Sequence, residues 1–176
     1  MQSVKSVQTD RILRAAIGLL ILAFVYLLYV SIHERVVVVG DSAPEFTVTA
    51  DTGRTVGLPN FGGKLLVLNF WATWCPPCVE ETPSLSEFAR RFSGQGVVVL
   101  GVSVDKDEKQ YRAFLQQHRP AFLTARDAAA RINADYGTFK YPETYIIDAR
   151  GKVVQKIIGP ADWADEKMIS YVSSLL

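Results

Sequence analysis

Two continuous apolar runs, with a helical pattern between them, constrain the fold more than any other feature of the chain. The runs are KLLVLNFW at residues 64–71 and GVVVLGVSVD at residues 96–105. Uninterrupted apolar runs of this length are typical of strands that are buried on both faces. Apolar residues recur at helical spacing between residues 76 and 92. The segment therefore predicts a β-α-β unit of an α/β fold.

Further patterns on both sides of this unit predict two hairpins and three helices. The sequence FTVTADTGRTVGL alternates around a turn signal, which predicts an N-terminal β-hairpin over residues 46–58. Strands at residues 144–148 and 152–158 predict a second hairpin. This order predicts a central sheet with helices on both faces. The remaining expected elements are helices over residues 108–118, from Asp127 to about 135 and from near Asp162 onward, and a short strand over 121–124.

The composition is that of a globular protein. Hydrophobic residues make up 49% of the chain, and 19 basic residues nearly balance 18 acidic ones, for a net charge of +1. This balance argues against intrinsic disorder, which needs low hydrophobicity and high net charge. It also argues against a nucleic-acid partner, because binding a polyanion requires a clustered basic excess.

An apolar run near the N-terminus predicts a transmembrane anchor. The run AAIGLLILAFVYLLYVSI, at residues 15–32, has 18 residues and no charge. As a helix it would reach roughly 27 Å, close to the hydrocarbon thickness of a bilayer. A cleaved signal peptide is the alternative, because a basic leader precedes the run. No small-x-small cleavage site follows, however, and the run is long for a signal core.

The flanking charges predict the orientation and the domain plan. Lys5, Arg11 and Arg14 precede the run, and mainly acidic residues follow it. The positive-inside rule therefore places the N-terminus in the cytoplasm. We expect a cytoplasmic segment at 1–14, a single-pass signal-anchor helix at 15–32 in the bacterial cytoplasmic membrane and a linker at 33–40, where VVVV could add a strand. An extracytoplasmic (periplasmic) domain at 41–176 would then face an oxidising compartment, where disulfides persist.

The chain has two cysteines, Cys75 and Cys78, and three readings of the pair can be compared. A zinc site needs four ligands, and the chain adds only His33 and His118, neither of which is nearby in sequence. A covalent haem site would need a histidine directly after Cys78, where the chain has a valine. A purely structural disulfide over so short a loop would remove little entropy from the unfolded chain.

A redox function explains the placement of the pair. The strand that ends at Trp71 brings the chain to the carboxyl edge of the sheet, where ligands collect in α/β folds. Cys75 would then cap the following helix, where unpaired N–H groups and the helix dipole favour the thiolate. Pro76 suits the first helical position, because its missing N–H would have no partner there. Cys78 lies one turn deeper on the same face, within bonding distance and shielded.

The sequence FWATWCPPC after a buried strand, followed by TYIID behind Pro142, resembles the thioredoxin superfamily. It is most similar to the membrane-anchored TlpA/ResA/DsbE-like branch, the thiol-disulfide oxidoreductases linked to cytochrome c maturation. The resemblance covers roughly residues 39–176 and includes GDSAPEF, GVSVD, YPETYIID and IIGP. It implies an α/β thioredoxin-like fold with a central mixed β-sheet flanked by helices.

The resemblance also implies roles for individual residues. Cys75 matches the attacking cysteine and Cys78 the resolving one, so the redox-active disulfide serves in place of a cofactor. Pro142 matches the cis-proline of the family, and Tyr141 would line the substrate groove. In this branch an asparagine, here Asn69, replaces the buried aspartate of thioredoxin.

Several neighbours of the cysteine pair are further site candidates. Glu81 matches a glutamate of this branch; partly desolvated, it would raise the pKa of the cysteines and could accept a proton. Glu80 is interpreted as part of a solvated helix face, and His118 as a packed or rim histidine. The candidate substrate contacts are Trp74, Pro76, Pro77, Tyr141 and Glu143.

The residues between the cysteines indicate the direction of electron flow. They are two prolines, with no cation or histidine to stabilise a thiolate as a strong oxidant requires. We therefore expect a protein-disulfide reductase. The resemblance implies recharging by a transmembrane CcdA/DsbD-type electron donor, and the CxxCH disulfide of apocytochrome c as substrate.

Alternatives from other classes remain open at this point. They are a disulfide-forming oxidant, a reductase of copper-centre cysteines, a copper metallochaperone, a thiol peroxidase and a tethered module without catalysis. A metallochaperone of this fold would need a CxxxC motif and a distal histidine. The sequence indicates no oligomeric interface, so we expect a monomer.

Overall fold

The computed structural model describes residues 2–32 and 36–176, with the side chains of residues 13–28 in the first helix. The chain forms two units, Met1–Arg35 and Val36–Leu176. The first unit contains the helix α1 (Gln2–Ile32), in which most of the described large apolar side chains are exposed, Leu20 by 70%. None of the helices in the described part of the chain combines the length and the apolar content that crossing a membrane requires.

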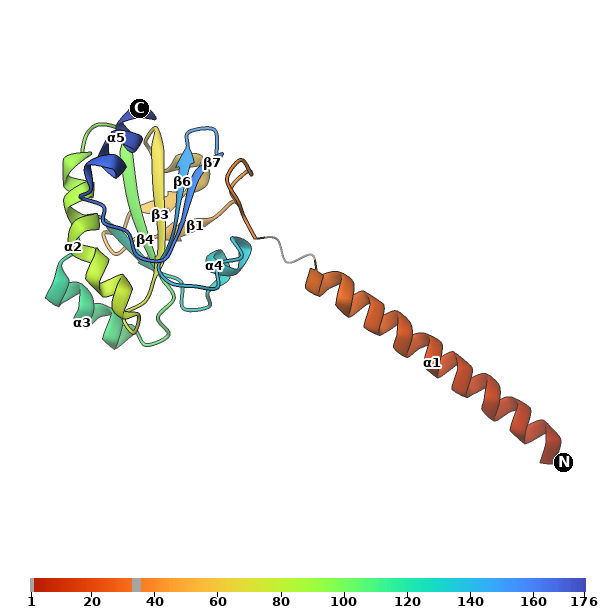
Figure 1. The fold of residues 1–176 in the computed structure, drawn as a ribbon. Helices are drawn as coiled ribbons and strands as arrows, with labels where there is room; N and C mark the ends of the chain where they lie inside the picture. The colour runs from red at the N-terminus through yellow and green to blue at the C-terminus, as the bar shows by residue number, and fades with distance from the viewer. Residues whose placement is uncertain (1, 33–35) are drawn as a thin grey trace. The chain divides into compact units, whose positions relative to one another are not determined.

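A five-stranded mixed sheet forms the centre of the second unit (Figure 1). Its strand order is β5-β4-β3-β6-β7, in which β3, β4 and β5 are parallel and β6 and β7 are antiparallel to their neighbours. The central mixed sheet that the sequence predicted is therefore confirmed. The strands are β3 (Leu65–Trp71), β4 (Val97–Ser103), β5 (Leu123–Arg126), β6 (Glu143–Asp148) and β7 (Val153–Ile158).

Strand β3 separates two apolar layers because successive side chains of a strand point to opposite faces. Leu66, Leu68 and Phe70 pack with a cluster that includes Tyr136 and Tyr145. Leu65 and Val67 pack on the other face against apolar residues of α2 and α5. All seven residues of β3 are buried, as its unbroken apolar run predicts.

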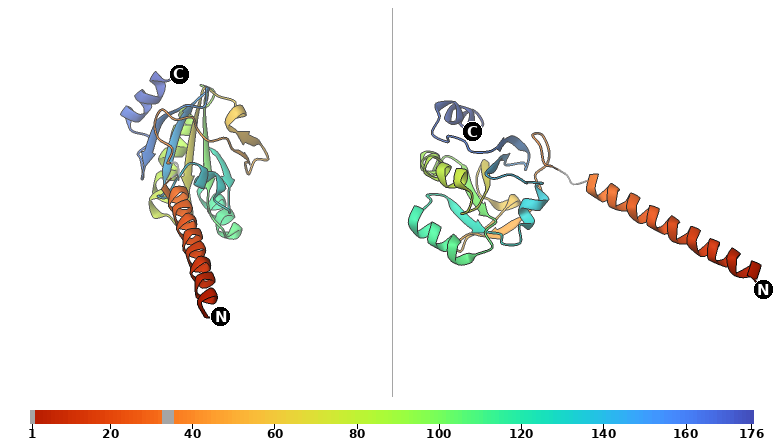
Figure 2. Two further views of the ribbon diagram at one scale, coloured as in Figure 1. Left: turned by 90° about the vertical axis from the view of Figure 1, so that its right-hand side faces the viewer. Right: turned by 60° about the horizontal axis from the view of Figure 1, so that its bottom comes forward.

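Three helices lie on the second of these faces (Figures 1 and 2). Phe88 of α2 contacts Trp163, just before α5, with ring centroids 5.2 Å apart. Helix α3 extends this layer, because Phe114 packs on Trp71 with centroids 4.8 Å apart. The helices are α2 (Pro76–Arg91), α3 (Glu108–His118) and α5 (Glu166–Ser174).

The opposite face is covered by a hairpin, a short helix and the chain that leads into the domain. The hairpin strands β1 (Thr47–Thr49) and β2 (Thr55–Gly57) pair antiparallel, with Val48 opposite Val56, and form a separate two-stranded sheet. A 3₁₀ turn, η1 (Leu58–Asn60), leads from β2 toward β3. The short helix is α4 (Arg131–Asp135).

Two helices start later than the sequence predicted, because aspartates at the expected starts make turns instead. The Asp127 carboxylate accepts the N–H of Ile132 at 2.8 Å, and α4 begins only after Ala130, which has a φ of 51°. Asp162 accepts the N–H of Ala164 at 2.9 Å, while Asp165 is the residue that caps α5. Side-chain oxygens of aspartate stabilise turns and helix caps alike, so sequence does not separate the two.

The compact unit begins at Val36, within the predicted linker of residues 33–40, rather than at residue 41. Val37 is buried in the core, and its N–H donates to the carbonyl oxygen of Tyr136 at 3.2 Å. Its own carbonyl accepts from Lys156 Nζ at 2.9 Å. No strand forms over the described residues 36–39. Residues 33–35, which include His33 and the start of the predicted linker, lie outside the described residues.

A substitution at Gly101 of β4 tests how tightly this core is packed. A Cβ atom there would lie 2.9 Å from Phe122 Cε2 and 3.0 Å from Trp71 Nε1, so a ring must move. We expect Gly101→Ala to lower the free energy of unfolding by about 1–3 kcal/mol, measured by urea denaturation of the full chain. Gly18→Ala is the control, since nothing lies within 4 Å of its added Cβ. Equal stability of the two variants would contradict the close packing.

Candidate active site

Cys75 caps the N-terminus of α2, as the sequence predicted. Its backbone is extended, with φ −100° and ψ 100°, and its N–H donates to the carbonyl of Ala72 at 3.2 Å. Its sulfur accepts the N–H of Cys78 at 3.3 Å, and the same N–H also donates to the Cys75 carbonyl at 3.0 Å. Pro76 is the first helical residue.

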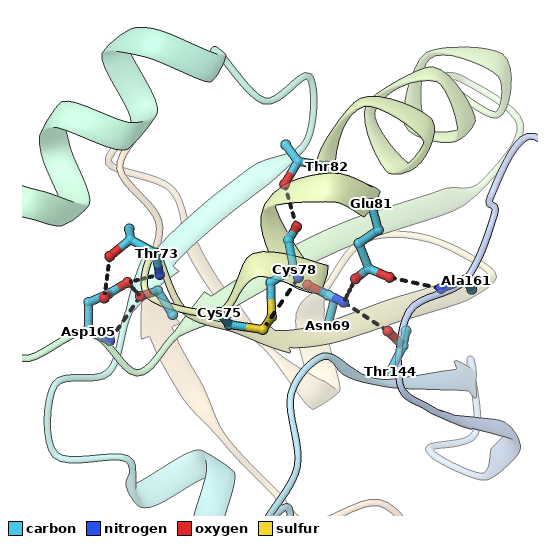
Figure 3. Close-up of a disulfide and its surroundings, with 10 residues drawn as sticks. Asn69, Thr73, Cys75, Cys78, Glu81, Thr82, Asp105, Thr144 and Ala161 are labelled. Atoms are coloured by element: carbon cyan, nitrogen blue, oxygen red, sulfur yellow. Dashed lines mark hydrogen bonds between the residues drawn. A yellow bond between two sulfur atoms is a disulfide. The ribbon is translucent and has the colours of Figure 1, made fainter.

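Cys75 and Cys78 form a disulfide, with their Cα atoms 5.3 Å apart (Figure 3). The residues are 5% and 2% exposed, so the predicted contrast between a presented and a shielded cysteine is small in this oxidised state. Both belong to an apolar cluster with Trp71, Tyr111 and Phe114. Trp71 therefore packs in the cluster around the disulfide, as expected.

The Tyr141–Pro142 peptide bond is cis, as predicted. Tyr141 packs against the disulfide cluster, and its hydroxyl donates to Asn133 Oδ1 at 2.8 Å, which fixes the ring. Trp74 is 60% exposed and meets Tyr141 edge to face, with centroids 5.7 Å apart. The two rings form an aromatic rim beside the disulfide, where a substrate can make contact.

The two residues between the cysteines differ in exposure. Pro76 is exposed and Pro77 is half-buried. Neither has a backbone N–H, so neither competes with Cys78 for the Cys75 sulfur. Pro76 is thus available on the surface as a substrate contact, and Pro77 less so.

Glu81 lies on the next turn of α2 after Cys78 and is buried (Figure 3). Its Oε1 accepts from Asn69 Nδ2 at 2.9 Å, and its Oε2 accepts from the backbone N–H of Ala161 at 3.1 Å. Asn69 also donates to Thr144 Oγ1 at 2.9 Å, which joins β3, β6 and α2 in one polar network. The asparagine that replaces the aspartate of thioredoxin is thus a hydrogen-bond partner of Glu81.

Burial raises the pKa of Glu81 above its ordinary value, because removing water disfavours the charged carboxylate. The N–H groups of Ala161 and Asn69 oppose this shift by stabilising the charged form. The Trp163 indole also lowers the pKa of Glu81. Its Nε1–H is buried, and among the described residues it has no partner within hydrogen-bond distance and angle. Glu81 is thus a carboxyl group whose proton affinity is raised next to a redox-active disulfide.

Glu143 does not fit its predicted role as a substrate contact, because its side chain is fully buried. It points to the sheet face opposite α2, where Oε1 accepts from Tyr145 Oη at 2.6 Å and pairs with Lys156 Nζ at 2.8 Å. Its other oxygen is buried without a partner. The residue next to the cis-proline therefore stabilises the core side of β6.

Asp105, two residues after the end of β4, is a site residue that was not predicted from the sequence. It is 1% exposed and accepts from the Thr73 N–H at 2.9 Å, the Thr73 hydroxyl at 2.7 Å and the Ser103 hydroxyl at 2.6 Å (Figure 3). These bonds fix the loop between β3 and Cys75. The signal was present, since an acidic residue that follows a buried parallel strand lies at the carboxyl edge of the sheet.

The remaining candidates lie outside this network. Glu80 is exposed, as predicted for a solvated helix face. His118 stacks on Phe114 with ring centroids 4.2 Å apart, as a packed or rim histidine would. In the part of the chain that the structure describes, no three His, Cys, Asp or Glu residues come together as metal ligands.

Comparison with known proteins agrees with this geometry. The AhpC/TSA family profile matches residues 39–156. The thiol-disulfide oxidoreductase ResA of Bacillus cereus is 33% identical over 171 residues, which cover 94% of this chain and 97% of that protein. The thioredoxin-like protein YneN of Bacillus subtilis is 39% identical over 120 residues, 67% of this chain and 69% of that protein.

A solved structure gives the same result at the level of the fold. The thiol:disulfide interchange protein DsbE from Chlorobium tepidum superposes with a TM-score of 0.72 at 28% identity, covering 79% of this chain and 98% of that one. In this chain the disulfide lies at the junction between β3 and α2, as the sequence predicted. The chain therefore belongs to the AhpC/TSA family, and it is a thiol-disulfide oxidoreductase of the ResA/DsbE type.

Proposed function

We propose that the chain reduces disulfides of extracytoplasmic proteins in two steps. In the first, the Cys75 thiolate attacks one sulfur of a substrate disulfide. A Cys75–substrate disulfide forms, the substrate disulfide breaks, and the first substrate sulfur leaves as a thiolate. Cys75 attacks because it caps α2, where the N–H of Cys78 and the helix dipole favour its thiolate.

In the second step Cys78 releases the substrate. Its thiol loses a proton to Glu81, and its sulfur attacks Cys75 Sγ. The Cys75–Cys78 disulfide forms, and the second substrate sulfur leaves as a thiolate. The substrate gains two electrons and the cysteine pair loses two, which leaves the oxidised state that the structure holds.

One observation carries this proposal: the disulfide caps a helix that carries a buried carboxyl group one turn later, and Tyr141, which precedes the cis-proline, packs against the disulfide cluster. A structural crosslink would need neither neighbour. The aromatic rim of Trp74 and Tyr141 offers a binding surface for a protein substrate. We assign Pro142 and this rim to substrate binding.

The environment of the disulfide favours reduction over oxidation. A carboxylate close to the thiols disfavours their ionisation, and the cluster around the disulfide is apolar. A strong oxidant of this type has a reduced form that is stabilised as thiolate. Both effects destabilise the thiolates of the reduced pair, so the pair gives up its electrons readily. A disulfide-forming oxidant is the alternative function.

The resemblance to cytochrome maturation proteins supports a specific protein substrate and a specific electron donor. We propose the CxxCH disulfide of apocytochrome c as substrate, with the copper-centre cysteines of an oxidase as a second possibility. A transmembrane CcdA/DsbD-type carrier would return the electrons, drawing on cytoplasmic thioredoxin. The chain would act as a monomer, because each exchange needs only one cysteine pair.

We further propose that residues 15–32 anchor the chain in the cytoplasmic membrane, with the catalytic unit outside. The structure describes the side chains of α1 for residues 13–28. The proposal of a membrane anchor is therefore based on the sequence. Eighteen consecutive residues without a charge and the basic residues before them support it. An anchor would hold the domain beside its membrane donor and raise the effective concentration.

The reduction potential of the Cys75–Cys78 pair tests the direction. We expect a value near or below roughly −270 mV, that of thioredoxin, because the nearby carboxylate and the absence of a cation between the cysteines disfavour the thiolates. Equilibration of the chain with thiol buffers across pH measures it. A value near −120 mV would make the protein an oxidant.

Variants of the two cysteines test the order of attack. With a CxxCH peptide disulfide as substrate, Cys78→Ser is expected to accumulate the mixed disulfide, because the second step has lost its nucleophile. Non-reducing electrophoresis and mass spectrometry detect this adduct. Cys75→Ser is the matched control and should form none. Full reductase activity of Cys75→Ser would contradict the mechanism and favour a module without catalysis.

Membrane fractionation tests the anchor. We expect the full chain to remain in the membrane pellet after alkaline carbonate washing, and protease added to spheroplasts to digest residues 41–176. A chain that lacks residues 1–35 is the control and should be released. Release of the full chain by carbonate would refute the anchor without affecting the redox mechanism.

A further inference from the structure

The loop between β7 and α5 reaches the active site with a backbone group rather than a side chain. The N–H of Ala161 donates to Glu81 Oε2 at 3.1 Å (Figure 3). The loop is held on both sides of this contact. Gly159 N–H donates to the carbonyl of Pro142 at 2.8 Å, and Trp163 N–H donates to Ser84 Oγ at 3.4 Å.

The burial of Trp163 fixes the position of the loop between β7 and α5. The residue is fully buried, and its ring packs on Phe88 of α2 with centroids 5.2 Å apart. Ser84, which accepts its N–H, lies one turn after Glu81 on the same helix. The Ala161 N–H is therefore fixed relative to the helix that carries Cys78 and Glu81.

Glu81 receives one N–H donor on each carboxylate oxygen, from Asn69 on Oε1 and from Ala161 on Oε2. The donors come from β3 and from the loop, so they fix the plane of the carboxylate. Neither N–H can accept a proton, and each oxygen has two lone pairs. A proton that arrives at Glu81 must therefore use the remaining lone pair of an oxygen.

A surface depression beside Glu81 allows that proton to be released to solvent. It has a volume of about 290 Å³ and lies between α2 and the loop. Its lining residues are Glu80, Glu81, Ser84, Pro160, Ala161 and Asp162. Glu81 and Ala161 both line this depression, so water can approach the buried carboxyl group from this side.

We infer that the loop Pro160–Asp162 is a positioning element of the redox site, and that the Ala161 N–H holds Glu81 as the proton acceptor of Cys78. The inference rests on the proposed function, in which Cys78 must lose a proton before it attacks. The proton passes from Cys78 Sγ to Glu81 and then to water in the depression. No electrons move in this transfer, and the Cys78 thiolate that remains attacks Cys75 Sγ.

The titratable groups that face Glu81 are few in the described part of the site. Cys78 lies on the same helix, and Glu80 and Asp162 line the depression. The groups that face Glu81 from β3 and from the loop, Asn69 and Trp163, are neutral. Thr144 of β6, bonded to Asn69, is neutral as well. The pH dependence of the second step therefore depends on Glu81 and Cys78.

The sign of the pH effect follows from the Ala161 hydrogen bond. Glu81 accepts a proton only as a carboxylate, so the rate rises with pH through the pKa of Glu81. The Ala161 N–H stabilises the carboxylate and lowers this pKa. Removing the N–H therefore shifts the rising limb of the pH–rate profile to higher pH.

Replacing the amide by an ester tests the inference. Ala161→lactic acid removes the N–H and keeps the side chain, and Ala161→Pro removes it genetically. We expect the rising limb to move up by about one pH unit, so that resolution of the mixed disulfide slows about tenfold at a pH on that limb, the effect of one hydrogen bond to a charged group. Stopped-flow resolution rates between pH 5 and 9 and carbon-13 NMR titration of the Glu81 carboxyl group measure the shift.

Ala164→lactic acid is the matched control, because it makes the same chemical change three residues later. Its N–H donates to Asp162 Oδ1 at 2.9 Å and not to Glu81. We expect this variant to keep the pH–rate profile and the NMR titration of the parent chain. A shift of equal size in the control would mean that the ester disturbs the loop, and would overturn the inference.

Glu81→Gln separates failure of the inference from failure of the proposed function. If Glu81→Gln leaves the rising limb unchanged, Glu81 is not the proton acceptor and that step of the proposed function is wrong. If Glu81→Gln removes the limb while both Ala161 variants leave it in place, only the inference is overturned. In the Glu81→Gln background, the Ala161 change is expected to have no further effect on the profile.

Discussion

At the N-terminus of α2, the sulfur of Cys75 lies where it accepts the N–H of Cys78. This arrangement requires the helix to begin directly at the cysteine. The buried strand β3 brings the chain to the carboxyl edge of the sheet, and Asp105 holds the intervening loop through Thr73. Two prolines then start the helix without adding N–H donors. The redox site therefore depends on where one helix begins.

The site is also bounded by carboxyl groups that lie in different elements. In the view of Figure 3 the disulfide lies between Asp105 and Glu81. Asp105 receives three hydrogen bonds and fixes the loop, whereas Glu81 receives two and is accessible from a depression. Glu143, on the far face of the sheet, is neutralised by Lys156. Three buried acids of this unit thus serve in three ways, which differ in their hydrogen-bond donors and in solvent access.

Much of the fold could be predicted from the sequence because its main elements have strong local signals. Helix α3 has the predicted bounds, since Asp107 caps it and Tyr111 and Phe114 mark its buried face. Strand β3 was evident from an unbroken apolar run. The start of α4 was not predictable, because it depends on a left-handed backbone at Ala130 that no residue type there indicates.

The site was predicted less completely than the fold, for a physical reason. The cysteine pair, the cis bond at Pro142 and the burial of Glu81 follow from motifs within one or two elements. The burial of Glu143 depends on which face of β6 it occupies, and TYIID is apolar on both faces, so alternation gives no signal. Ala161 contributes a backbone group from a loop 80 residues away from Glu81, and such a contact leaves no trace in residue type.

That last contact has a consequence for how the protein can diverge. An amide N–H is common to every residue except proline, so position 161 is free to change through evolution while the hydrogen bond to Glu81 persists. Sequence alignment would then show a variable loop at a place where the geometry is retained. Transplanting the Cys-Pro-Pro-Cys motif and its glutamate into another protein of this fold would omit this partner unless the path of the loop is transferred as well.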